Sequence, residues 1–392
     1  MNVSSRFTCP RCGNSDRNSI GVGPDGKEYC RRCLVFSGKQ AEPYVSSGKD
    51  IPLKLGYPLT AEQQRVSDQV LELIKQNRPA LIRAVTGAGK TELVYASMAY
   101  VLSLHQPVAF STPRRDVAIE LEPRIREAFP DADIALVYGG HEEKLVGDIV
   151  VLTAHQLYRY PKYFGLVILD EIDAFPYAGD FVLKSFFRGS VKGTYIMLSA
   201  TPSEKDIKEL EKDRGEVIEL NVRYHQHPLP LPEIRKYGLL KDFAVLRCLK
   251  SFLNSGKPCF VFAPTIDRAR GLADFLRVFL PDGDSVDSKD PERERKIEDF
   301  KAGKLSYLVC TAVLERGVTV RDLQVIVVDA DSEIYDAPAL IQIAGRAGRK
   351  AGYDRGEVVF FVHTPSPWVK EAVETIVRIN ENARVQGLFQ NS

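Results

Sequence analysis

The stretch AVTGAGKT, residues 84–91, decides the fold of this chain. An apolar run, residues 80–85, precedes it and a helical pattern, residues 90–104, follows it, so the stretch is a turn between a strand and a helix. At such a junction Gly87 and Gly89 let backbone N–H groups turn toward phosphate oxygens, and the helix dipole strengthens the attraction. The stretch therefore predicts a phosphate-binding loop rather than a strand–helix turn with accidental glycines.

The side chains of this loop suit a nucleoside triphosphate with magnesium. Lys90 is placed to hold the β- and γ-phosphates, and the hydroxyl of Thr91 is placed to ligate Mg²⁺. The residues expected to bind the nucleotide here are Thr86, Gly87, Ala88, Gly89, Lys90 and Thr91.

Outward from the loop, apolar strand-like runs alternate with helical patterns, which predicts an α/β fold with parallel sheets. The first series of runs covers residues 80–85, 108–110, 134–137, 149–152, 166–169, 195–198 and 217–220. A second series covers residues 260–263, 307–310, 325–328 and 358–362, and a final helix is expected to start near Ser366.

Pro228, Pro230 and Pro232 separate the two series, and prolines at alternate positions can neither continue a helix nor pair centrally in a sheet. We place the lobe boundary there. The expected organisation is a zinc-binding module at 1–36, a linker at 37–56, a first lobe at 57–222, a Pro-rich connector at 223–238 and a second lobe at 239–392.

The overall composition is that of an ordinary soluble globular protein, with 392 residues, 44% hydrophobic and 27% charged. The net charge is only +1, so any nucleic-acid contact must come from local groups that line a groove. No apolar stretch approaches the roughly 18 residues of a membrane span, and the polar N-terminus is not a signal peptide. We expect a cytoplasmic protein.

An acidic motif, Asp170-Glu171-Ile172-Asp173, follows the apolar run at residues 166–169. A strand end places these carboxylates at the edge of the sheet where ligands bind in open α/β folds. We assign Mg²⁺ binding to Asp170, directly or through water, and polarisation of the attacking water to Glu171. Acids at strand ends are often merely solvated, but together with the phosphate loop the pattern is specific.

Two further motifs follow. Ser199 and Thr201, after the run at residues 195–198, can link the acid pair to the part of the protein that holds a polymeric track. The motif QIAGRAGR, residues 342–349, provides two arginines that on one helix face could reach a γ-phosphate from the opposite lobe and stabilise transition-state charge. The alternative is a surface helix with salt bridges. The residues assigned to catalysis here are Gln342, Arg346 and Arg349.

Four cysteines near the N-terminus have the spacing C-x2-C-x17-C-x2-C: Cys9, Cys12, Cys30 and Cys33. Two such pairs predict tetrahedral thiolate coordination of Zn²⁺, and four thiolates leave no open position, so the zinc is structural. With few large apolar residues, the module should fold only with metal. His225 and His227 form another potential metal pair, but their place in the Pro-rich connector favours packing or polar exposure.

The charges of this module do not decide whether it binds DNA or a protein. Its basic residues outnumber its acids, but a zinc ion with four thiolates carries about −2 and offsets most of the excess. DNA binding and docking of a protein partner are therefore both possible. The basic residues are Arg6, Arg11, Arg17, Lys27, Arg31 and Arg32, and the acids are Asp16, Asp25 and Glu28.

Hydroxyl, basic and glycine residues recur at predicted strand ends, where motor lobes grip a nucleic-acid backbone. Singly, each is better explained as an ordinary loop or cap residue, but their recurrence at strand ends on one edge favours a shared role in holding the track. The candidates are Thr112, Arg114, Arg115, Gly139, Gly140, Thr153, His155, Thr265 and Thr311. Phe175 and Tyr177, just after the acid motif, could stack on bases, or their loop could be docked by apolar contacts.

In this order, the motifs AxxGxGKT, DExD, SAT and QxxGRxGR resemble those of superfamily 2 helicases. Together with the cysteine module, DEIDAFPY at residues 170–177, RYHQHPLPLP at 223–232, LERGVT at 314–319 and QIAGRAGRK from Gln342, the chain is similar to the ComFA family, the late-competence DNA-uptake ATPases of transformable Gram-positive bacteria. The resemblance covers nearly the whole chain.

That resemblance implies two RecA-like lobes, Mg²⁺–ATP hydrolysis stimulated by single-stranded DNA, and a role in drawing DNA through a membrane channel. It also implies partners among competence proteins, including a ComFC-like protein and the DNA channel, which would place the protein peripherally at the inner face of the membrane. The rivals are a replication-restart or repair DNA helicase, an RNA helicase, and a nucleotide-switched DNA-binding adaptor that does not translocate.

Two positions bear on nucleotide selectivity. The resemblance assigns Gly317 to the nucleotide site, but Thr319 stands where many superfamily 2 proteins have an Asp that reaches the ribose. Leu59 and Thr60 with Gln63 resemble a motif in which an amide reads both edges of adenine, and Gln64 is an equal candidate by chemistry.

Overall fold

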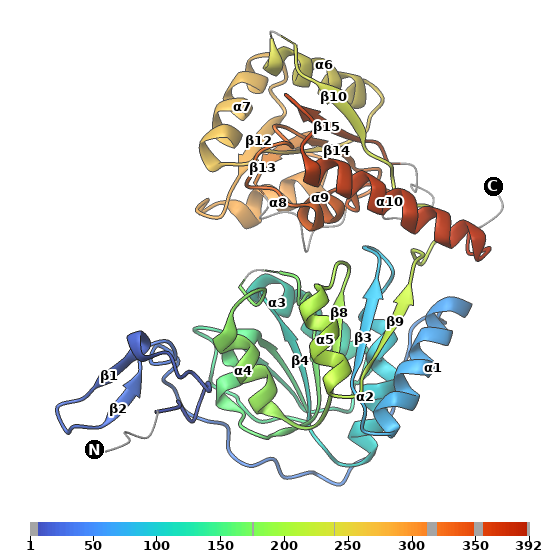
Figure 1. The fold of residues 1–392 in the computed structure, drawn as a ribbon. Coiled ribbons are helices and arrows are strands. Elements are labelled where there is room, and N and C mark those ends of the chain that lie inside the picture. The colour runs from blue at the N-terminus through green and yellow to red at the C-terminus, as the bar shows by residue number, and fades with distance from the viewer. Residues whose placement is uncertain (1–6, 175, 239, 312–319, 349–355, 390–392) are drawn as a thin grey trace. The chain divides into compact units, whose positions relative to one another are not determined.

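The computed structural model describes residues 7–174, 176–238, 240–311, 320–348 and 356–389. The chain divides into two compact units, one of residues up to Ala84 with Gly89–Leu220, the other of Val85–Ala88 with Asn221 onward. Each unit contains one large sheet whose paired strands are all parallel (Figure 1). The predicted α/β architecture of two tandem lobes is confirmed.

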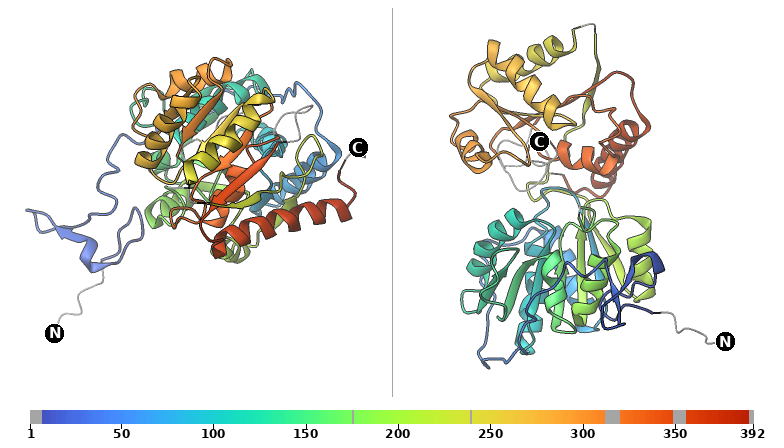
Figure 2. Two further views of the ribbon diagram at one scale, coloured as in Figure 1. Left: turned by 90° about the horizontal axis from the view of Figure 1, so that it is seen from above. Right: turned by 90° about the vertical axis from the view of Figure 1, so that its left-hand side faces the viewer.

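The first unit is built on a seven-stranded sheet in the order β5-β6-β4-β7-β8-β3-β9. Every residue of β4, β6 and β7 is buried, as expected for apolar parallel strands with helices on both faces of the sheet (Figure 2). The strands are β3 Ala80–Ala84, β4 Val108–Thr112, β5 Ile134–Val137, β6 Ile149–Thr153, β7 Phe164–Leu169, β8 Val191–Ser199 and β9 Glu216–Leu220.

Two helices of this unit begin with a capping box. Thr60 caps the first of them in a reciprocal capping box with Gln63, and Ser203 caps α5 in the same way with Asp206. The elements are α1 Ala61–Lys75, η2 Glu92–Val94, α2 Tyr95–Ser103, α3 Arg115–Ala128, η3 Ala154–Arg159, α4 Phe181–Ser190 and α5 Glu204–Lys212.

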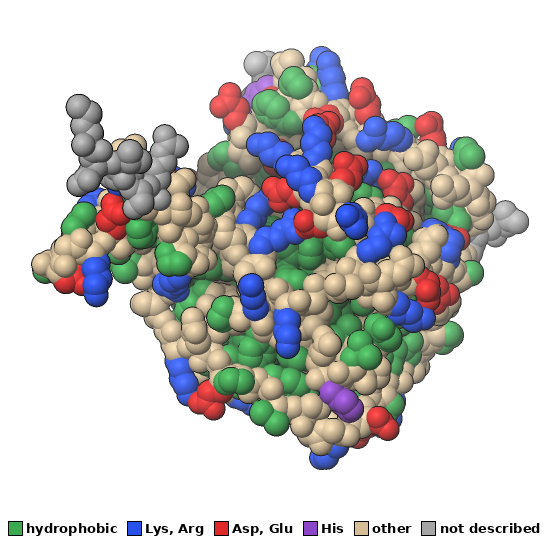
Figure 3. All heavy atoms as spheres, turned by 60° about the horizontal axis from the view of Figure 1, so that its bottom comes forward, with side chains coloured by type: hydrophobic (Ala, Val, Ile, Leu, Met, Phe, Trp, Pro, Cys, Tyr) green, Lys and Arg blue, Asp and Glu red, His purple; other side chains and the backbone are tan. Residues whose placement is uncertain are grey.

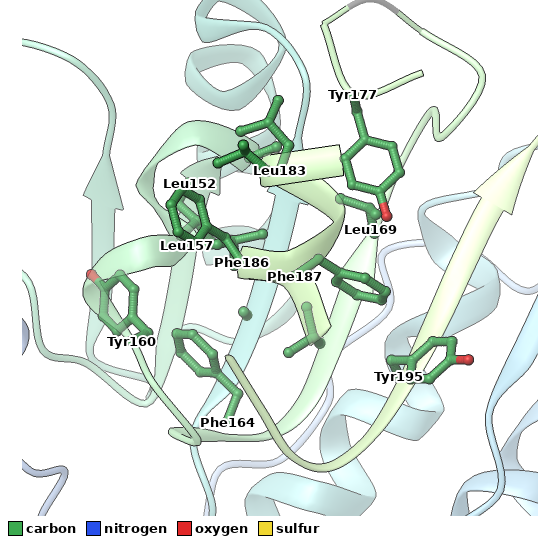
Figure 4. Close-up of a cluster of buried hydrophobic side chains, with 14 of the residues drawn as sticks. Leu152, Leu157, Tyr160, Phe164, Leu169, Tyr177, Leu183, Phe186, Phe187 and Tyr195 are labelled. Carbon is green, nitrogen blue, oxygen red and sulfur yellow. The ribbon is translucent and has the colours of Figure 1, made fainter. Parts of the chain in front are cut away.

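One side of this sheet is covered by an aromatic-rich core. Leu183, Phe186 and Phe187 of α4 lie in one buried cluster with Leu169 of β7 and Tyr195 of β8 (Figure 4). The ring of Phe187 meets that of Tyr195 edge-on, with centroids 5.2 Å apart. This packing fixes α4, which follows the acid motif of β7 in the chain.

The second unit is built on a six-stranded sheet in the order β10-β15-β14-β11-β13-β12. Its strands are β10 Glu233–Lys236, β11 Cys259–Phe262, β12 Gly283–Val286, β13 Tyr307–Cys310, β14 Gln324–Val327 and β15 Val358–Val362. Its helices are α6 Lys241–Asn254, α7 Ile266–Phe279, α8 Arg293–Lys301, α9 Ala337–Ala344 and α10 Pro367–Val385. Ser366 caps α10 and Pro367 occupies its first position, as predicted.

The two edge strands of this sheet lie outside the predicted runs. β10 pairs with β15 although its residues were expected in the connector, and β12 pairs with β13. Both are short and polar, with the sequences EIRK and GDSV. Edge strands need only one partner and often carry charges, so a search for apolar runs does not find them.

The N-terminal residues form a small hairpin with a short helix, η1 Arg17–Ser19, β1 Ile20–Val22 and β2 Glu28–Cys30. Among the described helices, none combines the length and the apolar character needed to cross a bilayer. On the face drawn in Figure 3, Lys and Arg side chains are interspersed with Asp and Glu side chains, in keeping with the net charge of +1.

Candidate nucleotide site and zinc module

The predicted phosphate loop lies between β3 and η2, as its sequence indicates. Gly87 and Gly89 have φ values of +81° and +76°, a region that residues with a Cβ rarely adopt. Thr91 is buried, and the first helical turn begins at the next residue. The backbone of the loop thus requires glycine at both positions.

The structure distinguishes the two glutamines that the sequence left equal. A Cβ added to Gly89 would lie 2.6 Å from Nε2 of Gln63, so the Gln63 amide lies directly on the phosphate loop. Gln63 is buried, and its Oε1 accepts a hydrogen bond from the backbone N–H of Thr60 at 2.9 Å. Gln64 is exposed, and its Nε2 donates to Asp68 at 2.8 Å. Gln63 is therefore the candidate adenine ligand.

The acid motif is tied to both neighbouring strands. The N–H of Asp170 donates to the carbonyl of Ser111, and the N–H of Ile172 donates to the carbonyl of Leu198. Between them Glu171 has φ +54°, the left-handed region that few non-glycine residues occupy. Such conformations concentrate at functional sites because they hold a side chain where regular backbone would not.

A direct contact joins the acid motif to the Ser199–Thr201 motif. Oγ1 of Thr201 donates to Oδ2 of Asp173 at 2.9 Å, and the N–H of Thr201 donates to Oγ of Ser199 at 2.9 Å. Strand order explains the contact, because β8 lies between β7 and β3 and so ends between the acid motif and the phosphate loop. These hydrogen bonds connect the Ser199 and Thr201 hydroxyls, which were predicted to have a coupling role, to the acid motif.

Asp173 is part of the DExD motif, but the sequence alone did not assign it a role. Its carboxylate is the group through which Thr201 reaches the acid motif. Tyr57 is a second residue near the candidate site that the motifs did not indicate. Its hydroxyl donates to Glu92, the residue after Thr91, at 2.9 Å, and its side chain is exposed. Tyr57 belongs to none of the sequence motifs described above.

In the second unit, Gln342 is buried on α9, but α9 ends at Ala344. Arg346 therefore lies in the turn after the helix, and the expectation that it lies on a helix face is wrong. Gly348, with φ +61°, continues this turn. Burial raises the pKa of Cys310 at the end of β13, and the charge of Arg346 opposes that shift. Arg349, Gly317 and Thr319 lie outside the described residues.

The strand-end candidates for the nucleic-acid track mostly have local roles. Thr112, Thr153 and Thr311 are buried, and Oγ1 of Thr112 donates to the carbonyl of Arg114. Thr265 is exposed and caps α7 by accepting from the N–H of Arg268. The groups that remain accessible include Arg115, whose guanidinium lies 4.8 Å from the ring centroid of Tyr138, and the half-buried Arg114.

The aromatic loop after the acid motif is only partly described. Tyr177 is 3% exposed, and its ring meets that of Phe187 edge-on at 6.2 Å. A ring buried in this way cannot stack on bases, so Tyr177 fits the alternative of a loop docked by apolar contacts (Figure 4). Phe175 lies outside the described residues.

The four N-terminal cysteines converge as a zinc site requires. Their sulfur atoms all lie within 4.8 Å of one another, and Cys9 and Cys33 are 3.5 Å apart, Cys12 and Cys30 3.7 Å. Tetrahedral coordination with Zn–S bonds of about 2.3 Å separates sulfurs by roughly 3.8 Å. Gly13, with φ +67°, turns the first knuckle by donating to the carbonyl of Cys9. The donor set and its spacing fit structural zinc.

Most of the module's basic residues are engaged within the first unit. Arg17 pairs with Glu28 at 2.8 Å, Arg32 with Asp16 at 3.0 Å, and Lys27 with Asp25 at 3.5 Å. Meanwhile Val22, Leu34 and Val35 expose 65%, 55% and 78% of their surface.

An aromatic contact attaches the module to η3 and α4. The ring of Phe36 stacks on that of His155 with centroids 6.1 Å apart and meets Phe186 edge-on at 5.1 Å. The guanidinium of Arg11 lies 5.6 Å from the ring centroid of Tyr158. Burial lowers the pKa of His155, and the nearby charge of Asp180 partly opposes that shift. The module thus packs beside a predicted track-binding segment.

Comparison with known proteins agrees with this architecture. Residues 60–210 match the DEAD/DEAH box helicase family and residues 243–351 match the helicase conserved C-terminal domain. Competence protein ComFA of Bacillus subtilis is 33% identical over 96% of this chain and 86% of its own length. The protein of the same name from Streptococcus pneumoniae is 34% identical over 96% and 91%. The solved structure of S. cerevisiae Dbp5 bound to RNA and ADP BeF3 superposes with a TM-score of 0.61 at 18% identity, covering 82% of this chain and 91% of that one, which shows a shared fold.

Proposed function

The chain belongs to the ComFA family, within the DEAD/DEAH box helicases, and on that premise we propose that it is an ATP-driven motor that moves along single-stranded DNA and powers DNA uptake during natural transformation. The observation that best supports ATP-driven movement is the hydrogen bond from Thr201 to Asp173 in the acid motif. A protein that only bound ATP would have no need to connect its hydrolytic acids to a second motif.

The proposed hydrolysis divides the work among residues of the phosphate loop, the acid motif and the QIAGRAGR motif. Lys90 and the backbone N–H groups of the glycine loop hold the phosphates, and Glu171 orients the attacking water. Thr91 and Asp170 would hold the Mg²⁺ that accompanies the nucleotide, and the ion would supply charge neutralisation at the phosphates. We assign to Arg346 and Arg349 the stabilisation of transition-state charge.

The coupling to DNA is proposed to pass through Ser199 and Thr201. A change in their position is transmitted to Asp173 by the 2.9 Å hydrogen bond, and from there along the same short loop to Glu171. This route would let an occupied track adjust the water-orienting carboxylate. Arg114 and Arg115 are the accessible basic groups proposed to contact the DNA backbone.

The nature of the track is tested by ATP hydrolysis with Mg²⁺ in the presence of single-stranded DNA, duplex DNA or RNA. Stimulation by single-stranded DNA alone is expected. Stimulation by RNA alone would assign the protein to the RNA helicases, and absence of turnover on every track would favour a nucleotide-switched adaptor.

The placement of Gln63 predicts a loss of base discrimination in the Gln63→Ala variant. Removing the hydrogen bonds of its amide to adenine should cost about 1–2 kcal/mol, or roughly tenfold in the preference for ATP over GTP. Because Gln63 also completes the cap of α1, its loss lowers stability by about 1 kcal/mol as well.

The ratio of kcat/KM for the two nucleotides separates these effects, since stability changes both values equally. Gln64→Ala is the matched control and should keep the wild-type ratio, because Gln64 is exposed and bonded to Asp68. An unchanged ratio in Gln63→Ala, or a changed one in Gln64→Ala, would contradict the assignment.

The second role proposed here is that the zinc module docks a protein partner, in keeping with its exposed Val22, Leu34 and Val35 and its paired charges. Other competence proteins at the membrane, including a ComFC-like protein and the DNA channel, are the proposed partners.

A further inference from the structure

Arg223 is the largest of the side chains that the structure buries completely, with 1% of its surface exposed. A buried guanidinium is costly unless its donors are satisfied. Nη1 of Arg223 donates to the carbonyl oxygens of Ala347 at 2.9 Å and Gly348 at 2.6 Å, and Nη2 donates to that of Gly345 at 3.1 Å. These three carbonyls belong to the turn that contains Arg346.

His225 binds the same turn. Its Nε2 lies 3.1 Å from the carbonyl oxygen of Gly348, and its Nδ1 accepts a hydrogen bond from the N–H of His227 at 3.2 Å. Because Nδ1 accepts, the ring proton lies on Nε2, which donates to the carbonyl. The two residues of the RYHQHP stretch thus hold four contacts to one short turn more than 120 residues away in the chain.

The same segment is attached to the second unit at two further places. The side chain of Asn380 on α10 accepts from the N–H of Leu229 and donates to its carbonyl, both at 2.9 Å. Four residues later β10 begins and pairs with β15. The backbone that carries Arg223 is therefore fixed from both the turn and α10.

We propose that Arg223 is a positioning residue for Arg346: its guanidinium holds the turn of Gly345–Gly348 so that the arginine between them is presented in one orientation. Arginine suits this task because its planar fork offers donors in several directions at once, whereas a lysine ammonium is a compact point charge on a flexible stem. Hydrogen bonds from a charged donor to three carbonyls are strong in a buried setting. The proposal rests on the proposed role of Arg346 in ATP hydrolysis.

A role in stability alone would make different predictions from a positioning role. If Arg223 only tied the connector to its unit, breaking another of the connector's attachments would have the same effect. Asn380→Ala supplies that comparison, since it removes both hydrogen bonds to Leu229 without touching the turn. If Arg223 acts through Arg346, its loss should matter little once Arg346 is absent.

The test is steady-state ATP hydrolysis on single-stranded DNA by the full chain and by five variants, Arg223→Gln, Arg223→Lys, Arg346→Gln, the double variant Arg223→Gln/Arg346→Gln, and Asn380→Ala. Arg346→Gln should lower kcat by about a hundredfold or more. Arg223→Gln should lower kcat by roughly 10- to 100-fold with KM for ATP changed less than about threefold, and Arg223→Lys should restore only part of it.

The double variant should be no slower than Arg346→Gln, and Asn380→Ala should keep the wild-type kcat. Losses that multiply in the double variant, or an equal loss in Asn380→Ala, would overturn the proposal. Should Arg223→Gln fail to fold, as judged by circular dichroism, Arg223→Lys carries the same comparison with Arg346→Gln. A normal kcat in Arg346→Gln would instead refute the proposed role of that arginine, and no turnover in the wild type would refute the motor itself, so each failure can be told from the others.

Discussion

The Glu171→Gln variant is expected to bind ATP as the wild type does but to hydrolyse it about a hundredfold to ten-thousandfold more slowly. The amide keeps the size and shape of the side chain but can no longer accept a proton from the attacking water. The left-handed backbone at Glu171 and the strand contacts on either side of it are unchanged by this substitution. Binding should therefore be preserved while turnover is lost.

The measurement combines equilibrium binding of a fluorescent ATP analogue with turnover at saturating ATP and single-stranded DNA. Glu204→Gln, on the exposed first turn of α5, is the matched control because it makes the same chemical change outside the acid motif. Equal turnover in Glu171→Gln and Glu204→Gln would remove Glu171 from the mechanism. Loss of ATP binding in Glu171→Gln would give it a structural role.

The second large effect is expected from Cys30→Ser, which should release the zinc and unfold the N-terminal module. Structural zinc sites contribute about 10–16 kcal/mol to folding in isolated zinc-finger peptides, far more than any single hydrogen bond. Within the module itself little else holds the chain, since its hairpin consists of two three-residue strands. Both α/β units should remain folded, because each has its own core.

Metal analysis and limited proteolysis measure this outcome. The wild type should hold one equivalent of zinc and resist cleavage between its cysteine pairs, whereas Cys30→Ser should hold none and be cleaved there. Cys248→Ser, in the buried core of the second unit, controls for the cysteine-to-serine change and should keep the zinc. A full equivalent of zinc in Cys30→Ser would refute the zinc assignment.

Much of the fold could be predicted because its parallel strands are buried on both faces and appear as apolar runs. Strands such as β4, β6 and β13 were predicted nearly to the residue for that reason. The polar edge strands β10 and β12 were not, because their pairing depends on neighbours that local sequence does not reveal. The role of Arg223 could not be predicted for the same reason, since its hydrogen-bond partners lie more than 120 residues away in the chain.

Within the candidate site, residues defined by backbone geometry were easier to predict than those defined by tertiary contacts. Gly87 and Gly89 follow from the loop conformation itself. The choice between Gln63 and Gln64 depends on which side of α1 meets the phosphate loop, and the burial of Tyr177 depends on how α4 packs. The placement of Gln63 and the burial of Tyr177 both depend on contacts between helices and loops, which a sequence motif does not specify.

The most direct test of the central claim is displacement of streptavidin from single-stranded DNA that is biotinylated at one end or the other. A motor that moves along single-stranded DNA should remove streptavidin from one end in an ATP-dependent manner, and Glu171→Gln should not. Hydrolysis that single-stranded DNA stimulates without displacement of streptavidin from either end would contradict the proposed translocation.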